Sequence, residues 1–486
     1  MSARAPGGGP GLRPQEVRVN VRPLARYAQI LDPDDYRRSE EAFGAVAALM
    51  RGRVVWHVNS TARGGGVAEM MGPLIGYARD SGVDTRWMVI SGSPAFFSVT
   101  KRIHNLLHAD PGDGGPLGPA ERRLYEGVLW ENAVELSAIV RRDDVVVLHD
   151  PQTAGLVPAM RRLGARVVWR CHIGHEDLAD PHVARGWAFL QPYLRDAERF
   201  VFSRAAYVPR FCPRDRVDLI SPSIDPFGPK NQELSPETTR AILSQAGLVE
   251  GGPGAAAPTF TRDDGAPGRV DRGADILHVG RLPRWETPLV VQVSRWDRLK
   301  DHLGVMNGFA RLEPADGSEA RLVLAGPSVT GVADDPDGPV VLAELTAAWR
   351  ALPHHTRRRV QIAMLPVVDP QENGAMVNAL QRHATVVVQK SLQEGFGLTV
   401  TEAMWKGRPV LASAVGGIVD QIDDGRDGVL LADPSDPDAF ARALTSLLDD
   451  PERAAVLGAA GHDRVRERLL SIRQLADYAR LIQSLG

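Results

Sequence analysis

Residues 54–78 read VVWHVNSTARGGGVAEMMGPLIGYA, and this stretch decides the fold class. The apolar, β-branched run at its start predicts a buried strand. Three consecutive glycines follow, Gly64, Gly65 and Gly66, and after them apolar residues recur at helical spacing. A strand, a glycine turn and a helix in this order begin a βαβ unit, which favours a parallel sheet.

The same alternation of strand and helix continues along the chain in two series. The predicted strands of the first series are residues 54–58, 85–90, 145–149, 166–170 and 199–202, and those of the second are residues 289–293, 321–325, 360–363, 385–389 and 409–412. At 486 residues, of which 43% are hydrophobic, the chain is long enough for two separate cores. We therefore expect an α/β protein with two Rossmann-like, doubly wound domains.

Prolines mark the expected boundary between these domains. Residues 221–230, SPSIDPFGPK, contain three prolines and a glycine, which is typical of a stiff crossing segment. Residues 250–286 are rich in Gly, Ala, Pro, Arg and Asp without a sustained period, which predicts a flexible surface insertion. The expected parts are residues 1–45 as a partly flexible N-terminal extension, 46–225 as the first domain, 226–470 as the second domain and 471–486 as a C-terminal helix.

Charge and cysteine content exclude several classes of protein. Lys and Arg number 57 against 60 Asp and Glu, so no global positive field attracts nucleic acid or an anionic membrane. Cys171 and Cys212 are too few for a disulfide framework and indicate a reducing compartment. No run approaches the roughly 18 apolar residues of a spanning helix, and no secretory leader is evident at the start. We expect a cytoplasmic protein.

Glycines and polar side chains follow the strands of the first domain, where ligands of open parallel sheets bind. The glycines at 64–66 let the backbone approach a phosphate at a helix N-terminus, although a flexible turn explains them equally well. His149, Asp150 and Gln152 follow the third strand, and His172 follows the fourth. A loop cap explains each residue singly, but together they indicate a polar site. The cluster at 172–177 matches no zinc-ligand spacing, so we expect no metal.

Two cations follow the first strand of the second domain. Arg295 and Lys300 would lie at the carboxyl edge of this sheet, where a guanidinium and an ammonium suit a diphosphate. The alternative is a charged helix start facing solvent, which is our interpretation of Arg298 and Asp301. Lysine is rare in this chain and occurs only at positions 101, 230, 300, 390 and 406.

The most specific local pattern is residues 393–405, QEGFGLTVTEAMW, between a strand and a helix. Glu394 and Glu402 stand eight residues apart, so they do not share a helix face and could hold two parts of an extended ligand. The glycines around Phe396 allow backbone amides to meet a phosphate or sugar at the helix start. Helix capping with a surface Glu is the alternative.

This Glu-x7-Glu spacing, the glycine-rich first turn and the Arg295–Lys300 pair resemble the family-4 retaining glycosyltransferases, which have two Rossmann-like domains in the GT-B arrangement, facing each other across a cleft. Five segments resemble the trehalose glycosyltransferring synthases in particular: residues 57–69, 97–105, 149–152, 170–173 and 394–406. His175 and residues 250–286 depart from that pattern. The resemblance also suggests that the C-terminal helix packs back on the first domain.

The resemblance implies a role for each matching residue. Glu402 would bind the nucleotide ribose, Glu394 the hydroxyls of the donor glucose, and Arg295 with Lys300 the diphosphate. His172 would contact the donor sugar near the reacting carbon, and Asp150 would orient the acceptor; with Arg295, Lys300 and Glu394 they form the implied catalytic set. The remaining implied contacts are Gly65, Gly66, Gly395, Phe396, Gly397 and Leu398 for the nucleotide sugar, and Asn59, Gly64 and Gln152 for the acceptor.

The implied reaction transfers glucose from a nucleoside diphosphate glucose, such as UDP-glucose or ADP-glucose, to free glucose, which gives α,α-trehalose with retained configuration. No cofactor would be required, and Mg2+ would at most stimulate. The partners would be these small molecules, and the family allows a homodimer. The alternatives are a trehalose phosphorylase, a transferase with another sugar or lipid acceptor, and a catalytically silent sugar-nucleotide binding protein.

Overall fold

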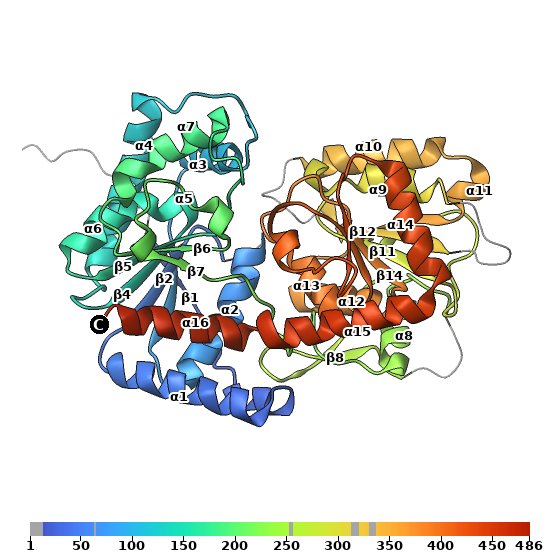
Figure 1. Ribbon diagram of the computed structural model, residues 1–486, viewed down its shortest axis with the longest axis horizontal. Helices are drawn as coiled ribbons and strands as arrows, with labels where there is room; N and C mark the ends of the chain where they lie inside the picture. The colour runs from blue at the N-terminus through green and yellow to red at the C-terminus, as the bar shows by residue number, and fades with distance from the viewer. Residues whose placement is uncertain (1–12, 63–64, 252–255, 313–319, 330–336) are drawn as a thin grey trace, which may run out of the picture. The chain divides into compact units, whose positions relative to one another are not determined.

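The computed structural model describes residues 13–62, 65–251, 256–312, 320–329 and 337–486. The chain divides into two compact units, Met1–Pro222 with Ser471–Gly486 (unit 1) and Ser223–Leu470 (unit 2). Each unit has its own seven-stranded sheet and its own hydrophobic core (Figure 1). The expected boundary at 225/226 lies next to this division.

The sheet of unit 1 is parallel except at one edge. Its order is β1-β3-β2-β4-β5-β6-β7, and only β1 runs antiparallel to its neighbour among these strands. The central strands are almost wholly buried because helices cover both faces, which explains their continuous apolar sequence. The bounds are β1 (Gln15–Val17), β2 (Val55–Asn59), β3 (Thr85–Val89), β4 (Val145–His149), β5 (Arg166–Cys171), β6 (Arg199–Phe202) and β7 (Val217–Leu219).

Helices cover this sheet in two groups. Figure 1 shows α1 and α16 on one side of the sheet and α3, α4 and α7 on the other, and α16 contacts both α1 and α2. The last helix of the chain therefore belongs to unit 1. The bounds are α1 (Pro33–Leu49), α2 (Gly65–Asp80), α3 (Pro94–Leu107), α4 (Pro119–Ser137), α5 (Asp150–Thr153), α6 (Val157–Arg162), α7 (Pro181–Leu194) and α16 (Ser471–Ser484).

Unit 2 repeats the parallel arrangement. Its order is β10-β13-β12-β11-β14-β15-β16, with only β10 antiparallel among them, and a separate hairpin joins β8 to β9. The bounds are β8 (Thr259–Thr261), β9 (Pro267–Arg269), β10 (Asp275–Leu277), β11 (Leu289–Val293), β12 (Arg321–Pro327), β13 (Val360–Leu365), β14 (Val386–Gln389), β15 (Val410–Ser413) and β16 (Val429–Leu431).

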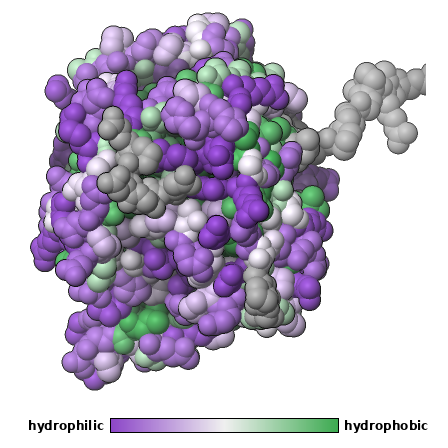
Figure 2. All heavy atoms as spheres, turned by 90° about the vertical axis from the view of Figure 1, so that its right-hand side faces the viewer, coloured by the Kyte–Doolittle hydropathy of each residue, from purple (hydrophilic) through white to green (hydrophobic). Residues whose placement is uncertain are grey.

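The helices of unit 2 also pack in groups. Helices α9 and α14 contact each other, as do α8 and α12, and α13 contacts α15. The face seen in Figure 2 is mainly hydrophilic, as expected of outer helices whose apolar sides point to the core. The bounds are α8 (Pro236–Gln245), α9 (His302–Phe309), α10 (Gly338–Ala351), α11 (His354–Arg357), α12 (Pro370–His383), α13 (Leu398–Trp405), α14 (Pro437–Asp449) and α15 (Pro451–Arg468).

A recurring local signal starts these helices. An Asp or Ser accepts a hydrogen bond from a first-turn N–H and is followed by a proline, whose fixed φ suits the first helical position. Seven helices begin this way, at Asp32, Ser93, Asp180, Ser235, Asp369, Asp436 and Asp450. Among the described helices, none combines the length and apolar character needed to cross a lipid bilayer.

Two segments differ from their predicted description. Residues 13–49 are built into unit 1 instead of extending from it, because β1 pairs with β3 and Phe43 and Val46 of α1 are buried. The described part of the segment expected to be a flexible insertion forms β8, β9 and β10. Polar contacts hold it: the Glu372 carboxylate accepts hydrogen bonds from the backbone N–H groups of Asp271 and Arg272, each at 2.7 Å. Such contacts leave no hydrophobic period in the sequence.

Candidate functional site

Lys300 and Glu394 meet at the carboxyl edge of the unit 2 sheet. Lys300 ends a short turn after β11, and Glu394 lies in the loop between β14 and α13. The Lys300 Nζ donates to Glu394 Oε2 at 2.5 Å, and the Ser391 hydroxyl donates to the same oxygen at 3.2 Å. The side chains are only 16% and 11% exposed, so water screens this pair weakly. The structure therefore brings together a fixed cation and a fixed carboxylate that the sequence predicted.

A second ion pair lies nearby and was missed from the sequence. Lys390 follows β14 directly, is 3% exposed and pairs with the Asp301 carboxylate. Asp301 also caps α9 by accepting from the Gly304 N–H at 3.0 Å. The prediction that Asp301 faces solvent was wrong, because its side chain is 18% exposed and neutralises a buried ammonium. The rarity of lysine and the position of Lys390 at a strand end could have indicated this pair.

The Arg295 side chain is more exposed than that of Lys300. It is 56% exposed, and its guanidinium lies 4.0 Å from the Asp297 carboxylate. Arg298 is exposed as predicted and forms two 2.7 Å hydrogen bonds with Glu344. At this edge Lys300 and Lys390 are the buried cations, while the Arg295 side chain is largely exposed.

The glycine loop before α13 has a fixed path. Gly397 has a φ of +84°, a conformation that L side chains rarely adopt, and it precedes the first residue of α13. The N–H of Gly417 donates to the Gly395 carbonyl at 3.2 Å, and the Gln421 side-chain amide donates to the Phe396 carbonyl. Phe396 itself is buried. Hydrogen bonds from the segment after β15 thus fix the loop.

Glu402 is a buried carboxylate, and one of its oxygens accepts no hydrogen bond from the described residues. Its side chain is 3% exposed, and Lys230 Nζ lies 3.3 Å from Oε1. Oε2 accepts no hydrogen bond from the described residues, although it is buried. Lys406 donates to the Glu402 backbone carbonyl at 3.1 Å and to Asn231 Oδ1 at 3.0 Å. Because buried polar atoms normally have a partner, Oε2 fits a ligand hydroxyl.

Unit 1 holds a chain of three histidines. His57 Nδ1 lies 3.0 Å from His149 Nε2, and His149 Nδ1 lies 3.0 Å from His172 Nε2. All three rings are buried. Burial and the nearby Arg170 guanidinium lower the pKa of His57 to about 3. Burial, the neighbouring histidines and Arg170 hold the pKa values of His149 and His172 well below the usual histidine range. The rings are therefore neutral at pH 7. The sequence did not predict that His57 belongs to this cluster.

Asp150 lies directly beside this chain. Its Oδ1 accepts a hydrogen bond from the backbone N–H of His172 at 2.7 Å, and its φ is +65°. Burial raises the pKa of Asp150 to about 7, although that hydrogen bond and Arg170 oppose the shift. The structure thus brings Asp150 and His172 together, as the sequence predicted.

The other predicted contacts of unit 1 are less clearly placed for binding. Asn59 is buried, and its side chain donates to the Thr61 carbonyl at 2.7 Å and accepts from Trp87 Nε1 at 2.8 Å. Gly65 and Gly66 begin α2, and Gln152 lies in α5. Gly64 lies outside the described residues. Within the described part of the chain, no group of three or more His, Cys, Asp or Glu side chains is arranged to hold a metal ion.

Comparison with known proteins gives matches in both units. Residues 57–209 match the family described as trehalose synthase, N-terminal domain, and residues 277–464 match glycosyl transferases group 1. A trehalose synthase from Rubrobacter xylanophilus is 35% identical over 97% of this chain and 99% of that protein. A trehalose phosphorylase from Pleurotus pulmonarius is 27% identical over 81% of this chain and 52% of that protein.

Solved structures share the fold. The crystal structure of an α,α-trehalose-phosphate synthase (UDP-forming) from Burkholderia xenovorans, in complex with glucose-6-phosphate, superposes with a TM-score of 0.64 at 15% identity. The match covers 89% of this chain and 100% of that chain. The GT-B fold class predicted from the sequence is confirmed.

Proposed function

Because this chain belongs to the trehalose synthase family of glycosyltransferases, we propose that it transfers glucose from a nucleoside diphosphate glucose to the anomeric hydroxyl of free glucose. The product is α,α-trehalose, and the configuration of the donor glucose is retained. The observation that carries the proposal is the carboxyl edge of unit 2. There Lys300 and Glu394 form a nearly buried pair, and a buried oxygen of Glu402 accepts no hydrogen bond from the described part of the chain.

Glu402 and Glu394 bind the two sugars of the donor. The Glu402 Oε2 atom accepts a hydrogen bond from a ribose hydroxyl, while Lys230 holds Oε1. Glu394, held by Lys300, accepts hydrogen bonds from hydroxyls of the donor glucose. The backbone of Gly395 to Leu398 contacts the diphosphate, which joins the ribose to the glucose.

The two cations act on the leaving group. As the bond between the anomeric carbon and the phosphate oxygen breaks, negative charge grows on the diphosphate, and Lys300 and Arg295 stabilise it. The acceptor hydroxyl forms the new bond on the same face of the sugar, and its proton passes to the leaving phosphate oxygen. This scheme needs no protein nucleophile, and fixed cations take the place of a metal ion.

The residues of unit 1 bind and orient the two sugars near the reacting carbon. His172 forms a hydrogen bond with the donor glucose, and Asp150 orients the acceptor glucose. Gly65 and Gly66 line the diphosphate and acceptor side, and Asn59, Gly64 and Gln152 complete the acceptor contacts. These groups position the reactants, which accelerates transfer by holding the hydroxyl near the anomeric carbon.

Product analysis tests the proposal. Purified protein is incubated with glucose and, separately, UDP-, ADP- or GDP-glucose without added metal, and the products are identified by carbon NMR. We expect a symmetric α,α-linked disaccharide together with the nucleoside diphosphate. If no donor reacts but trehalose and phosphate yield glucose 1-phosphate, the enzyme is a phosphorylase, the activity named for the Pleurotus relative. If neither assay gives a product, the enzyme transfers the sugar to another acceptor.

A further inference from the structure

The three histidines of unit 1 come from three adjacent strands of one sheet. His57 lies in β2, His149 ends β4 and His172 follows β5, and β4 pairs with both β2 and β5. The two 3.0 Å contacts join them into one continuous chain that ends at His172. His57 and His149 have no part in the reaction described above.

Proton counting restricts this chain. A neutral imidazole carries one N–H and one bare nitrogen, so a ring that donates through one nitrogen accepts through the other. His149 contacts a histidine at each nitrogen, and both contacts are hydrogen bonds only if all three rings donate in the same direction. The chain therefore has two concerted orders. In one order Nδ1 of His172 carries the proton, and in the other Nδ1 is bare.

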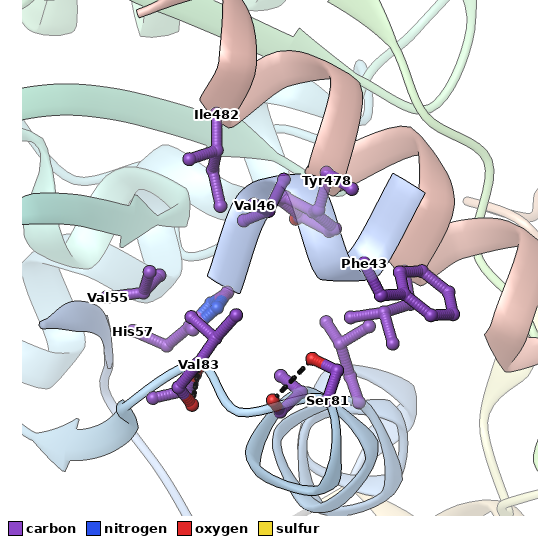
Figure 3. A pocket seen from close by; sticks show the side chains of 13 residues that line it. Phe43, Val46, Val55, His57, Ser81, Val83, Tyr478 and Ile482 are labelled. Carbon is purple, nitrogen blue, oxygen red and sulfur yellow. Dashed lines mark hydrogen bonds between the residues drawn. The ribbon is translucent and has the colours of Figure 1, made fainter. Parts of the chain in front are cut away.

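The two ends of the histidine chain have different surroundings. At one end His57 lines a cavity of about 30 Å³ with mainly apolar walls, among them Phe43, Val46, Val83 and Ile482 (Figure 3). The Tyr478 ring from α16 lies edge-on to His57, with centres 5.8 Å apart. At the other end the Arg170 Nε lies 3.3–3.4 Å from the two ring nitrogens of His172, and the His172 backbone is bonded to Asp150. Because the two ends differ, the two proton orders differ in energy.

We propose that His57 and His149 are positioning residues that hold His172 in a single tautomer, so that its ring presents a defined donor or acceptor to the sugar. The proposal rests on the proposed contact of His172 with the donor glucose. Its distinctive consequence is that His57, which is linked to His172 by hydrogen bonds through His149, controls which nitrogen of His172 is protonated.

Two substitutions at His57 separate this role from packing. His57→Phe keeps an aromatic ring, although a larger one, and removes the nitrogen that faces His149. His57→Asn is smaller, yet its amide places a donor or acceptor near the position of Nδ1. A residue needed only for packing would tolerate Phe better than Asn, whereas a residue needed for the hydrogen-bonded chain would tolerate Asn better.

Nitrogen NMR of protein labelled with ¹⁵N-histidine measures the tautomer directly. The chain has 13 histidines, and the His172→Gln variant assigns the His172 signals. In the unsubstituted protein we expect His172 to be a single neutral tautomer. In His57→Phe its two nitrogen shifts should move toward averaged values, and in His57→Asn they should stay near the original ones. Unchanged His172 shifts in His57→Phe would overturn the proposal.

Kinetics supply the second readout. We expect His57→Phe to lower kcat roughly tenfold, the lower end of the loss seen when a group that orients a metal-bound histidine is removed. KM should change little, and His57→Asn should restore most of kcat. A lower kcat in Asn than in Phe would contradict the proposal. The NMR result does not depend on turnover, so a protein with an ordered chain but no trehalose-forming activity would reject the proposed function alone.

Discussion

Lys300 and Glu394 are the single residues on which turnover should depend most. Replacing either by Ala removes a group that faces growing charge or a sugar hydroxyl, and we expect kcat/KM to fall about 10²–10³-fold in each variant. The measurement is release of nucleoside diphosphate, with circular dichroism as the check on folding. Arg298→Ala is the control, because the Arg298 guanidinium is exposed and forms its ion pair with the likewise exposed Glu344. A near-normal rate in either Ala variant would mean that the substituted residue takes no part in the mechanism.

Glu402 should decide nucleotide affinity. Glu402→Gln keeps the shape of the side chain but weakens a hydrogen bond between a ribose hydroxyl and a charged acceptor, worth about 1.5–3 kcal/mol. We expect the Kd for UDP or ADP, measured by titration calorimetry, to rise about tenfold or more. Glu344→Gln, at an exposed position of the same unit, should bind like the unsubstituted protein. Equal affinities in both variants would mean that Glu402 does not contact the nucleotide.

Asp150 should make stability depend on pH. Its pKa is raised to about 7 in the folded protein from an ordinary 3.8, so the folded state holds the proton more tightly than the unfolded state. The resulting stabilisation is complete below pH 3.8 and is lost as the pH rises through 7, by about 4 kcal/mol at most. Asp150→Asn keeps an acceptor oxygen for the His172 N–H and tolerates the positive φ, but does not titrate.

Melting curves of both proteins from pH 4 to pH 8 measure this effect. The Tm of the unsubstituted protein, relative to that of Asp150→Asn, should fall across this range. The lowered pKa of the neighbouring His172 contributes to the pH dependence of both proteins alike, so the difference between their Tm values isolates Asp150. A constant difference in Tm from pH 4 to pH 8 would show that Asp150 has an ordinary pKa.

Among the elements, the loop before α13 depends on a close backbone contact. A Cβ at Gly417 would lie 2.6 Å from the Gly395 carbonyl oxygen and 2.7 Å from the Phe396 Cα, so the Gly417→Ala loop must shift. We expect weaker binding of the nucleoside diphosphate and a lower Tm. Gly273→Ala is the matched control in the same unit, since a Cβ there meets nothing within 4 Å. If both variants bind UDP equally, the loop path is not needed for binding.

The longer buried strands could be predicted from the sequence, whereas short edge strands and elements held by polar contacts could not. The ten predicted strands all exist, because buried parallel strands read as continuous apolar runs. The three-residue edge strands β1, β7 and β16 were missed, because so few residues show no period. Strand β10 and the hairpin β8–β9 were also missed, since Glu372 and Asp369 hold that segment through hydrogen bonds and an ion pair. Such partners stand about 100 positions apart in the chain.

The same distinction applies to the candidate site. Motif spacing identified Lys300, Glu394 and Glu402, because each lies beside a glycine loop or directly after a strand. It did not identify Lys390 with Asp301, or His57 with His149, whose pairing depends on which strands are neighbours in the sheet. The strand order of a sheet is a tertiary property, so these pairs became visible only in the structure.

At the scale of the whole molecule, the chain forms two units, and its last helix returns to the first of them. Tyr478 of α16 is 4% exposed and contacts the ring of His57, and its ring centre lies 5.8 Å from the Arg170 guanidinium carbon. Tyr478→Ala leaves a cavity that should cost about 3–5 kcal/mol. For a unit of this size that is roughly 10 °C in Tm.

Scanning calorimetry can assign this loss to one unit. We expect the transition of unit 1 to move down in Tyr478→Ala while that of unit 2 stays in place, because Tyr478 packs within unit 1 although it follows the whole of unit 2 in the sequence. Tyr478→Phe keeps the ring against His57 and should melt within a few degrees of the unsubstituted protein. Equal shifts of both transitions in Tyr478→Ala would mean that the two units unfold together, so that damage to α16 destabilises the entire chain.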